Sequence, residues 1–316
     1  MRRFAVLVCF ITLSPCARRA AAQIPVAAVP ADTTTARDTA LNHPVVHECD
    51  APEPAWIFCD DFETDRLGKY FEYAHPDSSF ERTDSAGVLG SFGMRARFRK
   101  GQIDAGSLKL AFGKTPVPYM HPVDSGTTNY REIYWRVYLR DDSTWTGGGG
   151  DKLSRAQVLT SATWAQAAGA PVWASSGGLP GSNYLVLDPY SGTDAGGIVR
   201  ATTYNEFSRL RFLGMIRSAT PIFAPSRVGK WYCIEAHARL NDPGKNNGVF
   251  ELWIDDFIEA REGNLDWLGS YTDYGFNTVF FENYWNQGSP VEQSRYMDNI
   301  VVSTKRIGCG RLIGAD

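Results

Sequence analysis

The sequence has no excess of positive charge and no long hydrophobic run. Its 316 residues include 32 Lys and Arg against 35 Asp and Glu, a formal net charge of −3. A protein that binds nucleic acid through its overall charge is therefore excluded, and no nucleic-acid partner is expected. The apolar run Phe4–Leu13 has ten residues, too few to span a bilayer, and no other run is long enough. Hydrophobic residues still make up 43% of the chain, so complete disorder is excluded as well.

The motifs of several common enzyme classes are also missing. None of the five His stands in a His-Glu-x-x-His pair, and neither Gly-x-Ser-x-Gly nor Cys-x-x-Cys occurs. Gly113-Lys114-Thr115 lacks the upstream glycine of a phosphate-binding loop, and Pro116 follows where a helix should begin. Gly147–Gly150 lacks the dinucleotide fingerprint, and the Glu-x-Asp-x-Glu strand of sandwich-fold glucanases is absent. We therefore expect no organic cofactor.

The N-terminal segment has the pattern of a secretory signal. Positive charge in Met1-Arg2-Arg3 precedes the apolar run, and Ala20-Ala21-Ala22 provides the small residues that signal peptidase requires. We expect a signal peptide over residues 1–22 and secretion to an extracellular or periplasmic location, leaving a mature charge of −7. Residues 23–47 are rich in Ala, Pro, Thr and Val and predict a flexible tether. A single domain is expected over residues 48–316.

Four cysteines remain once the signal segment is removed. An even number in a secreted chain suggests two disulfides, for which three connectivities exist. We favour the pairs Cys49–Cys59 and Cys233–Cys309.

Strand signals recur every 10–20 residues and are separated by Gly, Pro, Asn and Asp clusters. Few stretches keep a helical period, so the pattern indicates an all-β sandwich. Alternation in Tyr130–Arg140 puts Ile133, Trp135, Val137 and Leu139 on one face. We expect these four residues in the core, together with Ile234, Leu252 and Ile254.

The polar faces of three predicted strands suit a sugar-binding surface. Aromatic rings stack on the apolar faces of pyranoses, and Arg pairs with uronate carboxylates. The alternative is the exposed strand of an ordinary sheet, where Tyr and Arg are common. The faces contain Tyr134, Arg136, Tyr138 and Arg140 in the first strand, Glu235, His237 and Arg239 in Trp231–Leu240, and Glu282, Tyr284 and Asn286 in Val279–Asn286.

Five short segments, in this order, resemble a known family. They are Asp60–Glu63, Gly148–Leu153, Trp231–Glu235, Leu252–Asp255 and Asp298–Ser303. The order is similar to the concanavalin A-like jelly rolls, especially the secreted polysaccharide lyases that cleave alginate or glucuronan, and it covers about residues 56–309. The resemblance implies a two-sheet antiparallel jelly-roll sandwich. A Lys in a Gly-Gly-Lys-Leu segment of those lyases is implicated in catalysis, which implies a catalytic role for Lys152.

The predicted function is cleavage of a uronate-containing polysaccharide by β-elimination. The carboxylate must be neutralised, for which we expect Arg136 or Arg140, and protons must move at C5 and at the leaving oxygen. The candidate acids and bases are Tyr138, Tyr284, His237 and Lys152. The predicted substrate contacts are Tyr134, Arg140, Glu235, Arg239, Glu282 and Asn286. We expect one concave sheet face to carry these groups, with Lys152 entering from the Gly-rich loop.

Two other functions stay open. A non-catalytic glycan-binding sandwich needs the aromatic rings and Arg but no acid or base. A glycoside hydrolase would use Glu235 with Glu251 or Glu282, provided that the two carboxyls lie close enough. In each case the expected partner is a polysaccharide and the chain is expected to be a monomer.

A structural calcium ion is a further expectation. The first and last strands of jelly rolls are often neighbours, which would bring Asp61 or Glu63 close to Asp298, as the family resemblance also implies. Calcium takes 6–8 oxygen ligands, so backbone carbonyls would complete the site. The alternative is that these acids only cap turns or pair with Arg.

Overall fold

The computed structural model describes residues 45–174 and 183–310. The chain divides into residues 1–35 and 36–316, and every described residue lies in the second part. The predicted signal peptide and all but the last three residues of the predicted tether lie outside the described residues. Within the part of the chain that the structure describes, no helix is long and apolar enough to cross a membrane.

The described residues form two antiparallel sheets, as the predicted all-β sandwich requires. The strands of the first sheet, in spatial order, are β15 (Phe257–Leu265), β14 (Gly248–Ile254), β13 (Tyr232–Arg239), β6 (Glu132–Asp141), β17 (Gln293–Ser303), β4 (Gly93–Phe98) and β3 (Phe80–Thr83). The first strand, β1 (Trp56–Asp60), pairs with the last strand, β17, and completes this eight-stranded sheet. The predicted neighbourhood of the first and last strands is confirmed.

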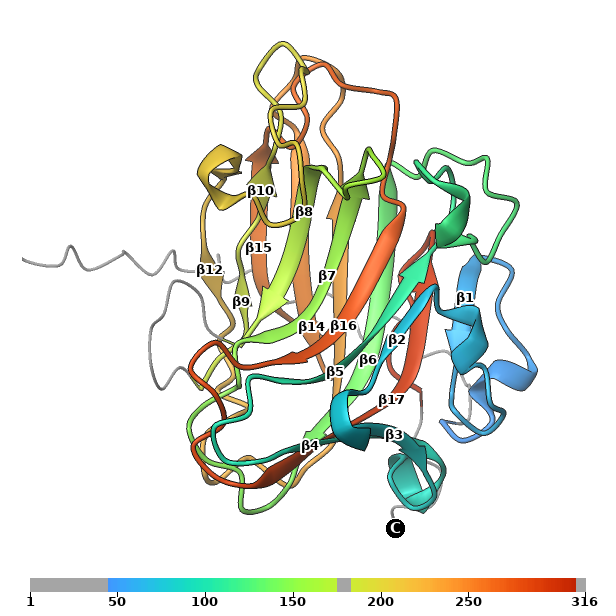
Figure 1. Ribbon diagram of the computed structural model, residues 1–316, viewed down its shortest axis with the longest axis vertical. Helices are drawn as coiled ribbons and strands as arrows, with labels where there is room; N and C mark the ends of the chain where they lie inside the picture. The colour runs from blue at the N-terminus through green and yellow to red at the C-terminus, as the bar shows by residue number, and fades with distance from the viewer. Residues whose placement is uncertain (1–44, 175–182, 311–316) are drawn as a thin grey trace, which may run out of the picture. The chain divides into compact units, whose positions relative to one another are not determined.

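The second sheet has nine strands. In spatial order they are β11 (Arg211–Phe212), β10 (Tyr190–Ser191), β8 (Gln166–Trp173), β7 (Lys152–Leu159), β16 (Thr278–Tyr284), β5 (Asp104–Ala111) and β2 (Glu72–Ala74). Strand β9 (Val186–Leu187) pairs with β8 and with β12 (Ile216–Arg217). In Figure 1, strands β7, β8 and β16 lie across β6 and β14 of the other sheet.

The only helices among the described residues are single 3₁₀ turns. They are η1 (Glu48–Asp50), η2 (Leu67–Lys69), η3 (Pro76–Ser78), η4 (Val88–Gly90), η5 (Pro118–Met120) and η6 (Phe207–Arg209).

The core lies between the two sheets and contains the residues that alternation predicted. Ile133, Trp135, Val137 and Leu139 of β6 are at most 1% exposed, and Ile234, Leu252 and Ile254 are also buried. Burying one such side chain contributes about 1.5–3 kcal/mol. The indole N–H of Trp135 donates to Ser154 Oγ of β7 at 3.0 Å, so one hydrogen bond joins the sheets inside the core.

Both predicted disulfides are present. Cys49–Cys59 ties the segment before β1 to β1 itself, and Cys233–Cys309 ties β13 to the segment that follows β17. Each disulfide thus fastens one end of the described chain to the eight-stranded sheet.

Candidate active site

The predicted site residues lie on two different sheets. Those of β6 and β13 alternate with core residues, so they lie on the outer face of the eight-stranded sheet. Lys152 begins β7, and Glu282 and Tyr284 belong to β16 of the nine-stranded sheet. The prediction of one shared surface is therefore wrong. Alternation shows which residues of one strand share a face, but it does not show which sheet the strand joins.

Arg136 and Tyr138 are covered by the ends of the described chain. The Arg136 guanidinium is 1% exposed, forms an ion pair with the buried Glu48 carboxylate, and donates to the backbone carbonyl of Gly308 at 2.9 Å. The Tyr138 hydroxyl donates to the Gly310 carbonyl at 3.5 Å, and burial raises the pKa of Tyr138 to about 12. Arg136 and Tyr138 therefore contact residues of the same chain at the positions where substrate contacts were predicted.

Glu235 is occupied by the same C-terminal segment. Its two carboxylate oxygens accept the backbone N–H groups of Ile307 at 2.7 Å and Gly308 at 2.9 Å. Glu282 lies on the other sheet, so the two carboxyls do not form the pair that a glycoside hydrolase needs. Glu251, the other carboxylate considered as a partner of Glu235, contacts His237 and Arg261 instead.

His237 lies between two carboxylates. Its Nε2 is 2.8 Å from Glu132 Oε1 and its Nδ1 is 2.6 Å from Glu251 Oε2, while Arg261 Nε contacts the second carboxylate at 3.1 Å. The imidazole stacks on Tyr134 with ring centroids 4.2 Å apart. This cluster is a closed network of polar contacts on the outer face of the eight-stranded sheet.

The two remaining predicted arginines of this sheet also have partners. Arg140 lies over the rings of Trp231 and Tyr296, at 4.9 and 4.3 Å from their centroids. Arg239 donates to the Asn247 carbonyl at 2.6 Å.

A different group forms on the outer face of the nine-stranded sheet. In the registers of β16, β7 and β8, Tyr284 is opposite Lys152 and Lys152 is opposite Trp173. The Lys152 ammonium lies 3.9 Å from the centroid of the Tyr284 ring. Burial lowers the pKa of Lys152, and among the described residues no carboxylate lies within ion-pair distance of its nitrogen. Lys152 is thus a cation whose charge no described carboxylate neutralises directly.

Arg155 lies beside Lys152 and Tyr284 and was not among the site residues predicted from the sequence. Its Nε is 2.8 Å from Glu282 Oε2, and its second terminal nitrogen donates to Glu282 Oε1 at 2.9 Å. The guanidinium also donates to Asn205 Oδ1 at 3.0 Å and to the Tyr204 hydroxyl. Burial lowers the pKa of Arg155, but the Glu282 carboxylate together with Tyr204 and Tyr190 outweighs this effect and leaves the pKa raised. Arg155 and Gln157 alternate with Ala156 and Val158, a signal that would have identified a polar face on this strand.

The polar face continues toward β10. The Gln166 amide donates to both the Gln157 carbonyl oxygen and the Tyr190 hydroxyl, each at 2.5 Å. The Tyr190 ring lies directly on Gly169, where an added Cβ would stand 2.1 Å from a ring carbon. Only glycine permits this close approach, so Gly169 fixes the tyrosine above the sheet. Burial raises the pKa of Tyr190 to about 12.

Asn286, the last of the predicted substrate contacts, follows β16 and is exposed. Its backbone N–H donates to Asp151 Oδ2 at 2.6 Å, which links the end of β16 to the start of β7. The structure therefore brings together Lys152, Tyr284, Glu282 and Asn286, and separates them from the predicted residues of β6 and β13.

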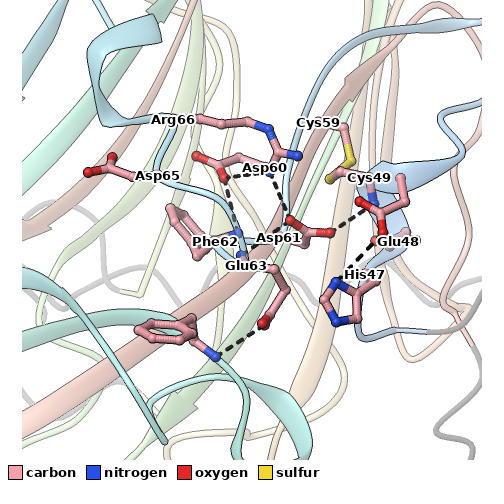
Figure 2. A network of polar contacts seen from close by, with 12 residues as sticks. His47, Glu48, Cys49, Cys59, Asp60, Asp61, Phe62, Glu63, Asp65 and Arg66 are labelled. Carbon is pink, nitrogen blue, oxygen red and sulfur yellow. Dashed lines mark hydrogen bonds and ion pairs between the residues drawn. A yellow bond between two sulfur atoms is a disulfide. The ribbon is translucent and has the colours of Figure 1, made fainter.

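The predicted calcium ligands already have protein partners. Figure 2 shows Asp61 between the guanidinium of Arg66, at 2.9 Å, and the backbone N–H groups of Cys49 and Glu63. Asp298 accepts the N–H groups of Val88 and Asn299. Burial raises the pKa of Asp298, with a smaller contribution from the charges of Glu63 and Asp61. Among the described residues, no three His, Cys, Asp or Glu side chains are grouped to hold a metal ion, and the calcium site stays a prediction.

Comparison with known proteins identifies the fold. No family model and no curated protein matches the chain. Among solved structures, the alginate lyase of Aplysia kurodai aligns with a TM-score of 0.50 at 13% identity, over 79% of this chain and 99% of that one. An alginate lyase from Chlorella virus and an endo-β-1,4-glucuronan lyase from Trichoderma reesei each give a TM-score of 0.49, at 12% and 11% identity, over 79% of this chain and 100% and 96% of theirs. The chain therefore has the jelly-roll sandwich fold that is also found in polysaccharide lyases.

Proposed function

We propose that this protein is a polysaccharide lyase that cleaves a uronate-containing glycan by β-elimination. The observation that carries the proposal is the Lys152–Tyr284 pair on the outer face of the nine-stranded sheet. It occurs in a fold similar to that of the Aplysia kurodai alginate lyase. The substrate would lie across β7 and β16.

Lys152 is the group proposed to neutralise the uronate carboxylate. Arg155 is already paired with Glu282, whereas Arg136 and Arg140 belong to the other sheet. Because burial lowers the pKa of Lys152, its ammonium is less stable in the free protein than in water. A bound uronate carboxylate stabilises the Lys152 ammonium. In return, the ammonium balances the carboxylate charge, which makes the neighbouring C5 proton more acidic.

Tyr284 is the group proposed to move the protons. In the proposed step Tyr284 acts as the phenolate: its oxygen accepts the C5 proton and then donates that proton to the leaving C4 oxygen. The C5–H and C4–O bonds break, a C4–C5 double bond forms, and the phenolate is regenerated. The Lys152 ammonium over the ring stabilises the negative charge of the phenolate. Arg155 and Glu282 act as positioning residues, because their ion pair connects β7 and β16 next to Lys152 and Tyr284.

We further propose that the protein works outside the cytoplasm. The two disulfides fit an oxidising compartment, where a secreted enzyme would meet extracellular polysaccharide. The sequence pattern of residues 1–22 supports the same destination.

The test is a screen of the purified chain from residue 23 onward against uronate polymers and neutral glycans. A lyase forms an unsaturated product, read both by ultraviolet absorbance and by mass. Lys152→Met and Tyr284→Phe should each reduce turnover by roughly 10²–10⁴-fold. Lys100→Met, at an exposed turn lysine, is the matched control and should keep full activity.

Two outcomes would overturn the proposal. If uronate glycans bind but no unsaturated product forms, the non-catalytic glycan-binding alternative replaces the lyase. If turnover survives in both variants, the reaction takes place elsewhere on the molecule.

A further inference from the structure

A second candidate site lies beside the Cys49–Cys59 disulfide and strand β1 of the eight-stranded sheet. A pocket of about 280 Å³ is bounded by the disulfide loop, β1, the segment after β1 and the loop after β5. Its lining consists of Cys49, Pro52, Trp56, Ile57, Phe58, Cys59, Arg66, Lys69 and Val123. None of these residues belongs to the Lys152–Tyr284 group, so the pocket is a separate feature.

The walls of the pocket are held by covalent and charged contacts. The disulfide joins two lining residues, and Asp61 accepts both the Cys49 N–H at 2.9 Å and the Arg66 guanidinium at 2.9 Å (Figure 2). The Arg66 guanidinium also lies 3.6 Å from Asp60. A ligand would therefore enter a pocket that is already formed, which reduces the entropy lost on binding.

The lining combines an apolar wall with a cationic rim. Trp56, Ile57, Phe58 and Val123 supply aromatic and aliphatic surface. At the rim, Arg66 is engaged by two carboxylates, whereas Lys69 is exposed and forms no ion pair with any residue that the structure describes. The pocket thus offers one uncommitted positive charge next to an apolar surface.

We propose that this pocket binds one carboxylated sugar ring of the same acidic glycan. The ring would stack on the apolar wall while its carboxylate meets Lys69. The volume is slightly below the common range of ligand sites, roughly 300–1,000 Å³, which suits one ring rather than an oligosaccharide. A single uncommitted cation matches one monoanion, and the absence of carboxylates from the lining argues against a metal ion. The choice of glycan rests on the proposed function, and the site would hold a long polymer without reacting with it.

The test measures binding of D-glucuronate by NMR, with D-glucose and inorganic phosphate as the other probes. The protein carries Lys152→Met so that the proposed active site contributes little binding. The reporter is the indole N–H signal of Trp56, assigned by its loss in Trp56→Phe. We expect glucuronate to shift this signal and Lys69→Gln to weaken binding by about fivefold or more. Lys100→Gln, again at an exposed turn, should leave the affinity unchanged.

Three results would overturn the proposal. They are no shift of the Trp56 signal with glucuronate, equal affinity in Lys69→Gln, or binding of phosphate as tightly as glucuronate. The binding measurement needs no turnover, so its failure is separate from failure of the lyase assay. Glucuronate binding without any cleavage of polymers would leave this pocket in place and remove only the lyase.

Discussion

The Arg155–Glu282 ion pair gives the sharpest test of the architecture around the proposed active site. The side chains of the two residues are 1% and 8% exposed, and two nitrogen–oxygen contacts of 2.8 and 2.9 Å join them. Glu282→Gln removes the negative charge and leaves the guanidinium buried. Removing one partner of a buried pair costs about 3–5 kcal/mol. Because Asn205 and Tyr204 still accept hydrogen bonds from Arg155, we expect a loss near 3 kcal/mol.

The assay is urea unfolding followed by circular dichroism, with both disulfides intact. In a parallel thermal unfolding experiment, a loss of about 3 kcal/mol corresponds to a fall of roughly 6–12 °C in melting temperature for a domain of this size. The double variant Arg155→Met/Glu282→Leu replaces both charges by apolar groups and should recover part of the loss. If Glu282→Gln costs less than about 0.5 kcal/mol, the pair is solvated, and the structural role assigned to it is wrong.

Four further predictions concern stability. Burial raises the pKa of Asp60 to about 7. The contribution of this raised pKa to stability is therefore complete below about pH 4 and is lost as the pH rises through 7. Asp60→Asn should reduce the difference in unfolding free energy between pH 5 and pH 8. Cys309→Ser opens the disulfide with Cys233, and its separation of 76 residues predicts a loss of roughly 4–5 kcal/mol in unfolding free energy. Cys59→Ser opens a disulfide with a separation of 10 residues and should cost roughly 3 kcal/mol. Urea unfolding should show this order. Arg136→Met should lower the unfolding free energy by about 3 kcal/mol, because its carboxylate partner stays buried without a counter-charge, while any lyase turnover measured on the folded protein stays unchanged. The predicted calcium site remains testable: a chelator that leaves the melting temperature unchanged, with no metal found by elemental analysis, would exclude it.

The fold could be predicted because its signals are local. Alternation along residues 130–140 is a property of one strand, and it places Trp135 in the core wherever the strand lies in the sheet. The disulfide pairs and the pairing of β1 with β17 were also predicted correctly. The Cys233–Cys309 disulfide and the β1–β17 pairing connect distant parts of the chain, and the resemblance to jelly rolls supplied the expectation for the strand pairing.

The composition of the site could not be predicted because it depends on which strands share a sheet. Arg136 has a sequence environment that favours a substrate contact, yet Glu48, 88 residues earlier, forms its ion pair. Glu235 is similarly occupied by Ile307 and Gly308, more than 70 residues later. Nothing near either residue in the sequence indicates that the ends of the chain cover them. Arg155 was missed although alternation along its strand indicates a polar face, and its partner Glu282 lies 127 residues away.

The charged groups on the two outer faces are paired differently, and this difference supports the proposed location of the active site. On the eight-stranded sheet, Arg136 is paired with a buried carboxylate and His237 contacts two carboxylates, so both groups already have partners within the fold. Lys152, on the nine-stranded sheet, is partly buried without an ion-pair partner among the described residues, and burial lowers its pKa. A cation held in this way costs stability and contributes no ion pair in return. Perturbed charges of this kind concentrate at functional sites, because a ligand of opposite charge supplies the missing partner. The position of Lys152 beside Tyr284 is therefore the place where an acidic glycan would gain most from binding.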